Sequence, residues 1–169
     1  MMKRIACAAV LLALIGCRRP EVPVGQFLLR VDGPWVTPRE AAGKNIKTAP
    51  GTLIVFRNDN EFFELHCRLI EQADGTWYVS STHPRASALG QWTKSGRKVH
   101  VVRQKISRAD AAAILCQPIT FDLTGNVVTG NAGGKGDGAY SPVTRLVAPD
   151  YPYYIKEARE SPVTCPKAE

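Results

Sequence analysis

A histidine stands directly beside a cysteine at one point of the chain, and this pair is the first candidate for chemistry. His66 precedes Cys67, and the other histidines are His83 and His100. A cysteine hydrolase needs a histidine base within hydrogen-bonding reach of its thiol. Successive side chains of a strand point to opposite faces, so within a strand His66 cannot act as the base for Cys67. The segment also lacks the glycine-rich turn or helix start that activates a thiolate, and we predict no cysteine catalysis.

Metal binding and carboxylate catalysis have no clearer signal. The histidines and cysteines lack the close spacing of metal-ligand motifs, so we predict no metal and no cofactor. The carboxylates of Asp59, Glu61 and Glu64 are the candidates for the acid and base of a cell-wall hydrolase. Nothing in their spacing favours that role, and we assign no catalytic residue.

Segment 126–141 contains five glycines together with Lys135 and Asp137. It differs from a phosphate-binding loop because its first glycine is one residue too close to the Gly-Lys pair and no Ser or Thr follows. It also has too few correctly spaced carboxylates for a calcium loop. We therefore predict a surface loop, with a partner-binding loop that uses Lys135, Asp137 and Tyr140 as the alternative.

The C-terminal part mixes aromatic and basic side chains, with Tyr151, Tyr153 and Tyr154 close to Lys156 and Arg159. Residues of these types are enriched at the centres of protein interfaces. They are equally typical of a tail that packs across a sheet. Both interpretations remain open, and the three tyrosines are candidate partner-binding residues.

The N-terminal residues have the pattern of an export signal. Lys3 and Arg4 precede an apolar run over 5–15, which is shorter than the ~20 residues of a membrane-spanning helix and suits a signal peptide. The run ends in the sequence Leu-Ile-Gly-Cys at 14–17. This ending resembles the lipobox of bacterial lipoproteins, in which a small residue precedes the cysteine that becomes lipidated.

The resemblance implies a membrane anchor. It predicts diacylglyceryl attachment to the thiol of Cys17, removal of residues 1–16, and acylation of the new amino terminus. Several acyl chains together give stable anchoring. Arg18 stands where an aspartate would retain many lipoproteins at the inner membrane, so the resemblance implies an outer-membrane location facing the periplasm. Residues 17–26 then form a tether of at most about 30 Å, and 27–169 a single domain.

Composition and charge fit an exported folded domain. The chain has 169 residues, of which 44% are hydrophobic and 22% charged, which argues against a disordered protein or one that spans the membrane many times. Loss of the signal leaves 20 basic and 15 acidic residues, a net charge of +5. This charge favours anionic neighbours such as lipid phosphates, cell-wall carboxylates or an acidic protein. Because the chain is exported, we predict no nucleic-acid partner.

Three cysteines remain for an oxidising compartment, namely Cys67, Cys116 and Cys165, which predicts one disulfide and one free thiol. Loop length does not distinguish a Cys67–Cys116 bond from a Cys116–Cys165 bond, because the two loops would be equally long. Cys67 lies on the apolar face of a predicted strand, where a free cysteine acts as a small hydrophobe. We therefore favour a disulfide between Cys116 and Cys165, with Cys67 as the alternative partner.

Alternating apolar residues and turn signals predict a chain of short strands. In segment 62–71, alternate positions from Phe63 to Leu69 share one apolar face. The Asp-Gly pair at 74–75 is a hairpin signal, so residues 52–81 are predicted to form a three-stranded antiparallel meander. Further strands are predicted at 27–31, 98–106, 119–123, 126–129 and 143–147, with a loop that holds His83 and Trp92.

Two short helices complete the prediction. The sequence Thr-Pro-Arg-Glu at 37–40 has the form of a capping box, and Ser107 is a candidate cap for a helix that Pro118 limits. No helix is predicted after Ala148. The predicted class is α+β, mostly antiparallel sheet arranged as a meander, small sandwich or barrel.

These features favour a membrane-anchored, non-enzymatic protein that binds another envelope protein or has a structural role. The first alternative is an inhibitor or immunity protein against a periplasmic enzyme that attacks the wall or membrane. The second is a cell-wall hydrolase.

Overall fold

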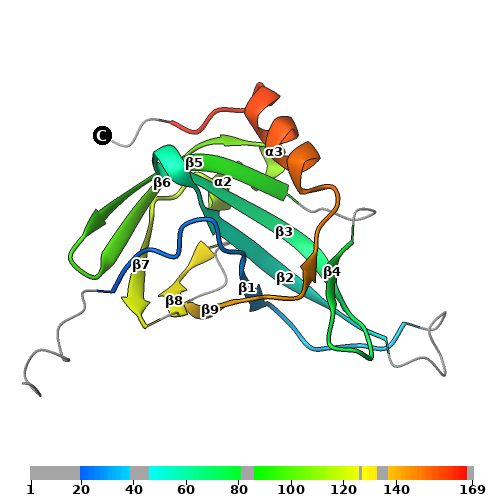
Figure 1. Ribbon diagram of the computed structural model, residues 1–169. Coiled ribbons are helices and arrows are strands. Elements are labelled where there is room, and N and C mark those ends of the chain that lie inside the picture. Colours follow the sequence, from blue (N-terminus) through cyan, green and yellow to red (C-terminus); the bar gives the residue numbers. More distant parts are fainter. Residues whose placement is uncertain (1–19, 39–45, 81–85, 126, 133–136, 167–169) are drawn as a thin grey trace, which may run out of the picture.

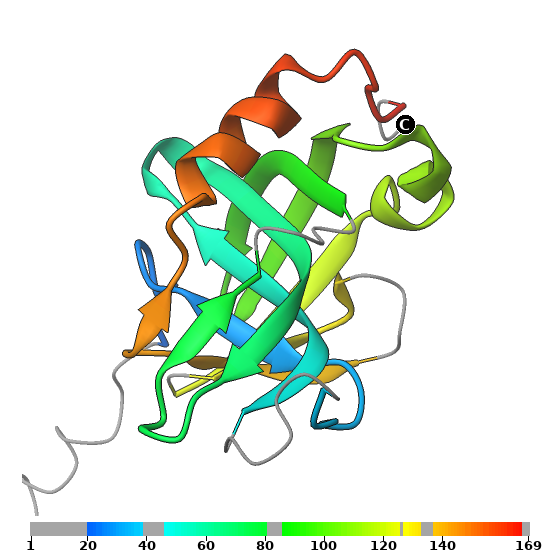
Figure 2. The same ribbon diagram turned by 90° about the vertical axis from the view of Figure 1, so that its right-hand side faces the viewer.

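The computed structural model describes residues 20–38, 46–80, 86–125, 127–132 and 137–166. In these residues ten strands form one sheet, and eight of them close into an antiparallel barrel (Figures 1 and 2). The order around the barrel is β1-β2-β3-β5-β6-β7-β8-β9, after which β9 pairs with β1. The predicted α+β class dominated by antiparallel sheet is confirmed.

Most elements are short. Their bounds are β1 Leu28–Val31, β2 Lys47–Phe56, η2 Asn58–Asn60, β3 Glu61–Glu71, β4 Trp77–Val79, β5 Ala86–Ser95, β6 Lys98–Ile106, η3 Ala109–Ala111, α2 Ala112–Leu115, β7 Ile119–Thr124, β8 Val127–Gly130, β9 Gly138–Pro142, β10 Leu146–Val147 and α3 Tyr151–Glu160.

Strand β3 closes the barrel because one of its edges is shared by two strands. Its residues 61–66 pair with β5, and its residues 69–71 pair with β4. The other edge pairs with β2 over ten residues. β4 and the parallel strand β10 therefore extend the sheet outside the barrel.

Alternation along the strands fills the barrel interior. In β7, Ile119, Phe121 and Leu123 point inward and are buried, while the residues between them are exposed. The rings of Phe56, Phe62 and Phe121 pack against one another at centroid distances of 5.5–6.0 Å. An eight-stranded barrel is just wide enough for side chains to fill its interior, and these rings fill it.

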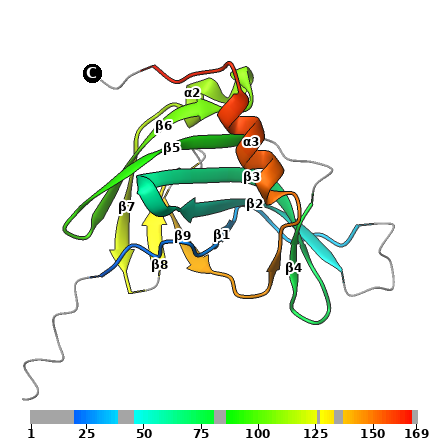
Figure 3. The same ribbon diagram turned by 45° about the horizontal axis from the view of Figure 1, so that its top comes forward.

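Helix α3 lies across the outer face of the sheet, where it contacts mainly β5 and β6 (Figure 3). Its buried residues Tyr154, Ile155 and Ala158 follow helical spacing and pack against the face of β3 that carries Phe63 and Leu65. That face is therefore apolar as predicted. None of the helices in the described ranges is long and apolar enough to span a membrane.

A β-bulge in the β5–β6 pair determines which side chains point outward. Leu89 pairs with Lys105, whereas Gly90 pairs with Arg103, which leaves Gln104 as the extra residue. A Cβ at Gly90 would lie 2.3 Å from the carbonyl oxygen of Val102, so only glycine fits this approach. The extra residue places Lys105 outside the barrel while Arg103 stays buried inside it.

The structure corrects several predicted elements. The predicted strand at 126–129 is present as β8, but segment 126–141 also contains β9, which was predicted as part of a loop and completes the barrel. Only Leu146–Val147 of the predicted strand at 143–147 is a strand, and it pairs with β4. The tail after Ala148 forms α3, and Trp92 lies in β5 rather than in a loop.

The predicted short helices have two different outcomes. The helix after Ser107 is present as η3 and α2, but the Ser107 side chain does not cap it. The Ser107 hydroxyl instead accepts a hydrogen bond from the backbone N–H of Ser87. The predicted helix that begins at the 37–40 capping box lies largely outside the described residues.

The predicted disulfide is confirmed. Cys116 and Cys165 are bonded, with their Cα atoms 5.1 Å apart, and Cys67 is free and buried. The bond joins the end of α2 to the segment after α3. It thereby holds the last described residues against β6, where Lys105 forms an isolated bridge with Thr164.

Removal of this disulfide should destabilise the protein by about 2–4 kcal/mol, because the unfolded chain regains the entropy of a 49-residue separation. The double variant C116S/C165S is compared with the oxidised wild type by urea denaturation. The reduced wild type is the matched control and should show the same loss. An unchanged unfolding midpoint in both samples would contradict this assignment.

Candidate functional site

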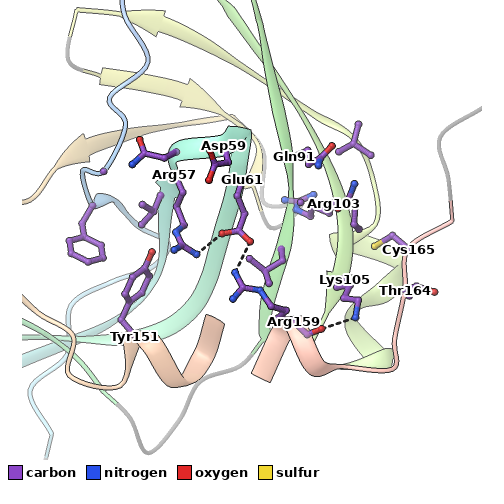
Figure 4. A pocket seen from close by; sticks show the side chains of 18 of the residues that line it. Arg57, Asp59, Glu61, Gln91, Arg103, Lys105, Tyr151, Arg159, Thr164 and Cys165 are labelled. Atoms are coloured by element: carbon purple, nitrogen blue, oxygen red, sulfur yellow. Dashed lines mark hydrogen bonds and ion pairs between the residues drawn. The ribbon is translucent and has the colours of Figure 1, made fainter. Parts of the chain in front are cut away.

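A groove of about 1350 Å³ runs along the outside of the barrel. Figure 4 shows its walls: the β2–β3 turn, the bulged part of β5 and β6, and α3 with the segment that follows it. The bulge lies in the groove through Gly90 and Gln104. The groove therefore forms where β6 departs from regular pairing.

Glu61 joins two walls of the groove through two ion pairs. Its carboxylate accepts hydrogen bonds from Arg57, four residues earlier, and from Arg159 of α3 at 2.8 Å. Lys105 of β6 donates to the backbone carbonyl of Arg159 at 2.6 Å. All four side chains reach solvent, so each pair contributes little stability. Their effect is to fix where the cations lie around the groove.

The third wall is built by the chain that the disulfide holds. The N–H of Cys165 donates to the carbonyl of Gln104 at 2.8 Å, and the N–H of Ile106 donates to Val163. The segment thus continues the edge of β6 beside the bulge. This pairing explains why Thr164 and Pro166 line the groove next to Lys105.

The groove also has an apolar part. It includes Phe27, Val55, Leu89, Val102 and Tyr151. The rings of Phe27 and Tyr151 meet edge to face at 5.0 Å, and burial raises the pKa of Tyr151 to about 12. A concave apolar surface with a few placed polar groups is the common form of a binding site. The exposed cations and amides at its rim suit a polypeptide segment.

A second polar cluster crosses the barrel interior. Arg103 Nε donates to Glu64 Oε2 at 2.7 Å, and Arg103 Nη1 donates to the carbonyl of Gln117 at 2.8 Å. The other Glu64 oxygen lies 2.6 Å from His66 Nε2. Both side chains of the Glu64–Arg103 pair are essentially inaccessible. The pair therefore belongs to the interior packing and does not form an exposed site.

The cluster continues to the rim of the barrel. Thr52 donates its hydroxyl proton to Asp32 at 2.5 Å, and the same oxygen lies 3.2 Å from His66 Nδ1. Arg30 Nε donates to Asp32 at 2.6 Å, and the Arg30 guanidinium lies 5.0 Å from the centre of the Tyr140 ring. Two guanidinium groups are thus compensated by two carboxylates inside one barrel.

Both ring nitrogens of His66 have a polar partner. Its Nδ1 lies 3.2 Å from the Thr52 oxygen, whose hydroxyl proton goes to Asp32. Its Nε2 lies 2.6 Å from Glu64. His66 therefore bridges Thr52 and Glu64.

The Thr52–His66–Glu64 order resembles a hydroxyl–histidine–carboxylate triad, but its environment prevents that chemistry. Thr52 is fully buried and its proton is committed to Asp32. Burial alone raises the pKa of Glu64, but Arg103 and then His66 outweigh burial and hold that pKa below its ordinary value of 4.5. Glu64 is therefore an ionised packing group and not a general acid.

Cys67 is likewise unsuited to nucleophilic chemistry. Its side chain packs with the outer cluster under α3 rather than with His66 and Glu64. Burial, with a smaller contribution from Asp32, raises the pKa of the Cys67 thiol to about 12. The thiol stays protonated at neutral pH, which agrees with the strand-face argument from the sequence. The described residues also contain no cluster of three or more side chains that could hold a metal ion.

The structure does not bring the predicted partner-binding residues together. Tyr140 lies inside the barrel and Tyr154 lies on the buried face of α3, so neither can contact a partner. Tyr151 lines the groove, whereas Tyr153 is 62% exposed outside it. Asp137 is exposed at the start of β9. Lys135 and the lipidation candidate Cys17 lie outside the described residues.

Of the other groove residues that carry a positive charge, only Arg159 was noted in the sequence, as a basic neighbour of the three tyrosines. Arg57, Gln91, Lys105 and Arg159 come from four separate parts of the chain, and no spacing links them. Glu61, considered as a catalytic carboxylate, is instead the ion-pair partner of Arg57 and Arg159. Asp59 lines the groove as an exposed turn residue.

The chain matches no protein-family model, and comparison with curated proteins and with solved structures likewise gave no match.

The interior ion pair should show strong coupling. Glu64→Leu alone leaves Arg103 buried without a countercharge and should cost about 3–5 kcal/mol. Arg103→Met alone should cost a similar amount, whereas the double variant should lie within about 2 kcal/mol of the wild type because neither charge of the pair is left buried without its partner. Urea denaturation of the four proteins measures the coupling. Additive losses in the double variant would show that the two residues do not interact.

The low pKa of Glu64 predicts a pH dependence of stability. The folded-state pKa lies below the unfolded value, so the contribution of Glu64 is complete above about pH 4.5 and is lost as the pH falls through the folded-state pKa. The free energy of unfolding should therefore fall in acid, with a shallower slope for Glu64→Gln. Asp59→Asn, which changes an exposed carboxylate, is the control and should keep the wild-type slope. Equal slopes for all three proteins would contradict the assignment.

Proposed function

We propose that this protein is a lipid-anchored binding protein of the bacterial cell envelope, which holds a segment of another envelope protein in the groove beside α3 and catalyses no reaction. The observation that carries the proposal is the contrast between a filled barrel and a groove outside it. The anchor is inferred from the lipobox resemblance at Cys17.

The filled interior supports an external site. Eight-stranded barrels either fill their interior with side chains or hold one small ligand there. Here Phe56, Phe62, Phe121 and Tyr140 occupy one part of the interior, and the Glu64–Arg103 pair occupies the next. A ligand inside the barrel would have to displace aromatic packing and uncover a buried charge pair. Both changes are costly.

The composition of the groove supports a polypeptide ligand. Three cations, Arg57, Lys105 and Arg159, surround an apolar area. Two carboxylates also line it: Glu61 is paired with two of these cations, and Asp59 is exposed at the turn. A peptide segment with acidic and apolar side chains would match this distribution. If the partner is itself an enzyme that attacks the wall or membrane, the same binding would make this protein an inhibitor.

A photo-reactive amino acid tests the position of the site. Placed at Gln91 in the groove, it should cross-link to one envelope protein in living cells, which mass spectrometry then identifies. Ala139, exposed on β9 across the barrel, is the matched control position and should give no product. Arg159→Glu should reduce the Gln91 product about tenfold, because a repulsive charge replaces a complementary one.

Two results would contradict the proposal. Equal cross-linking from Gln91 and Ala139 would show that the partner is not held in the groove. Cross-linking from Ala139 alone would move the interface to the opposite side of the barrel.

A further inference from the structure

The N-terminal segment is attached to one end of the barrel. Residues 20–26, predicted as part of the tether, lie against the barrel instead. Val24 forms a parallel bridge with Phe56, and the N–H of Gly25 donates to the Phe56 carbonyl at 2.8 Å. Val22 packs on the interior cluster. Residues 20–26 therefore add little to the reach of the predicted 17–26 tether.

The same segment is bonded to the β5–β6 hairpin. Lys94 Nζ donates to the carbonyl oxygen of Pro20 at 2.5 Å. Figures 1 and 3 show the first described residues beside the tip of this hairpin. Cys17 is three positions before Pro20 in the sequence, a span of at most about 11 Å. If Cys17 carries the lipid, the hairpin lies within reach of the membrane surface.

The hairpin is basic. Lys94, Arg97 and Lys98 surround its turn and are exposed, and Gly96 with φ +62° allows the tight turn. Arg97 donates to the carbonyl of Leu123 at 3.3 Å and to the hydroxyl of Thr124 at 3.2 Å, which holds the hairpin against β7. The cations are therefore presented by a rigid element.

The charge balance at this end is positive. Lys94, Arg97 and Lys98 are three exposed cations, against the carboxylates of Glu21 and of Asp122, which pairs opposite Lys98. Arg18 and Arg19, which follow the anchor cysteine in the sequence, add two positive charges to the chain and lie outside the described residues. Basic residues near an anionic membrane each favour binding by about fivefold, and a lipid chain combined with a basic patch anchors better than either alone.

From these observations we infer that the β5–β6 hairpin docks on the anionic lipid headgroups of the membrane that carries the anchor. The inference rests on the proposed lipidation of Cys17. Docking holds that end of the barrel at the membrane and turns α2, which packs at the other end of β6 with Ile106, away from it. The domain then has a fixed orientation relative to the membrane.

Fluorescence quenching tests the orientation with the full lipidated protein. A fluorophore is attached at S95C on the hairpin, or at A113C on α2 as the matched position, and the protein is placed in vesicles with headgroup-region quencher lipids. Vesicles containing phosphatidylglycerol should quench S95C and leave A113C bright. Phosphatidylcholine vesicles, or high salt, should restore most of the S95C signal.

Charge variants test the electrostatic part. K94Q/K98Q should lower the ratio of docked to undocked protein about 25-fold, at about fivefold for each lysine. K47Q/K156Q removes two exposed lysines elsewhere and should leave quenching unchanged. Equal effects of the two variants, or equal quenching at S95C and A113C, would overturn the inference.

The mass of the purified protein separates this inference from the anchor itself. If Cys17 is acylated but quenching is not selective for S95C, the docking inference is wrong and the proposed anchor stands. A protein that carries no acyl group, with the same distribution in cells as C17S, overturns both.

Discussion

The pairing of β3 with β5 is the interaction on which the rest of the structure depends. It joins the two ends of the sheet, and only the first part of β3 takes part, since Leu69 to Glu71 pair with β4. With that pairing in place the interior is sealed on all sides by hydrogen-bonded strands. Phe56, Phe62 and Phe121 can then pack as one cluster. Without the β3–β5 pairing, β3 and β6 would not enclose a common interior in which Glu64 and Arg103 could meet.

Because the barrel is closed and filled, the site that we propose for binding is the groove on its outer surface. The interior holds an aromatic part and a charged part, and neither leaves space for a ligand that keeps the packing intact. The bulge at Gly90 and Gln104 lets β6 contribute to both regions, because Arg103 points inward to Glu64 while Lys105 points outward to α3. Because of this one extra residue, β6 supplies Arg103 to the interior ion pair and Lys105 to the wall of the groove.

Local patterns predicted the parts of the fold that depend on neighbouring residues. The alternation in β6 and β7, the β2–β3–β4 meander and the Cys116–Cys165 bond were found correctly. The helical spacing of Tyr151, Tyr154, Ile155 and Ala158 was also present in the sequence, but Pro152 at the helix start and the nearby prolines favoured an irregular tail. β9 was missed because its glycine-rich segment resembles a loop, and only pairing with β1 and β8 makes it a strand.

The groove could not have been predicted in this way. Its residues come together through closure, the bulge and the docking of α3, which are all long-range events, and Glu61 becomes an ion-pair partner only when Arg159 reaches it. Hydrogen exchange of the β3–β5 amides, over 61–66 and 86–91, tests the closed barrel most directly. The account predicts that these amides exchange only through global unfolding, as slowly as those between β2 and β3. Exchange that is faster by orders of magnitude in the β3–β5 pairs alone would show an open sheet, and would contradict a filled interior with its binding site outside.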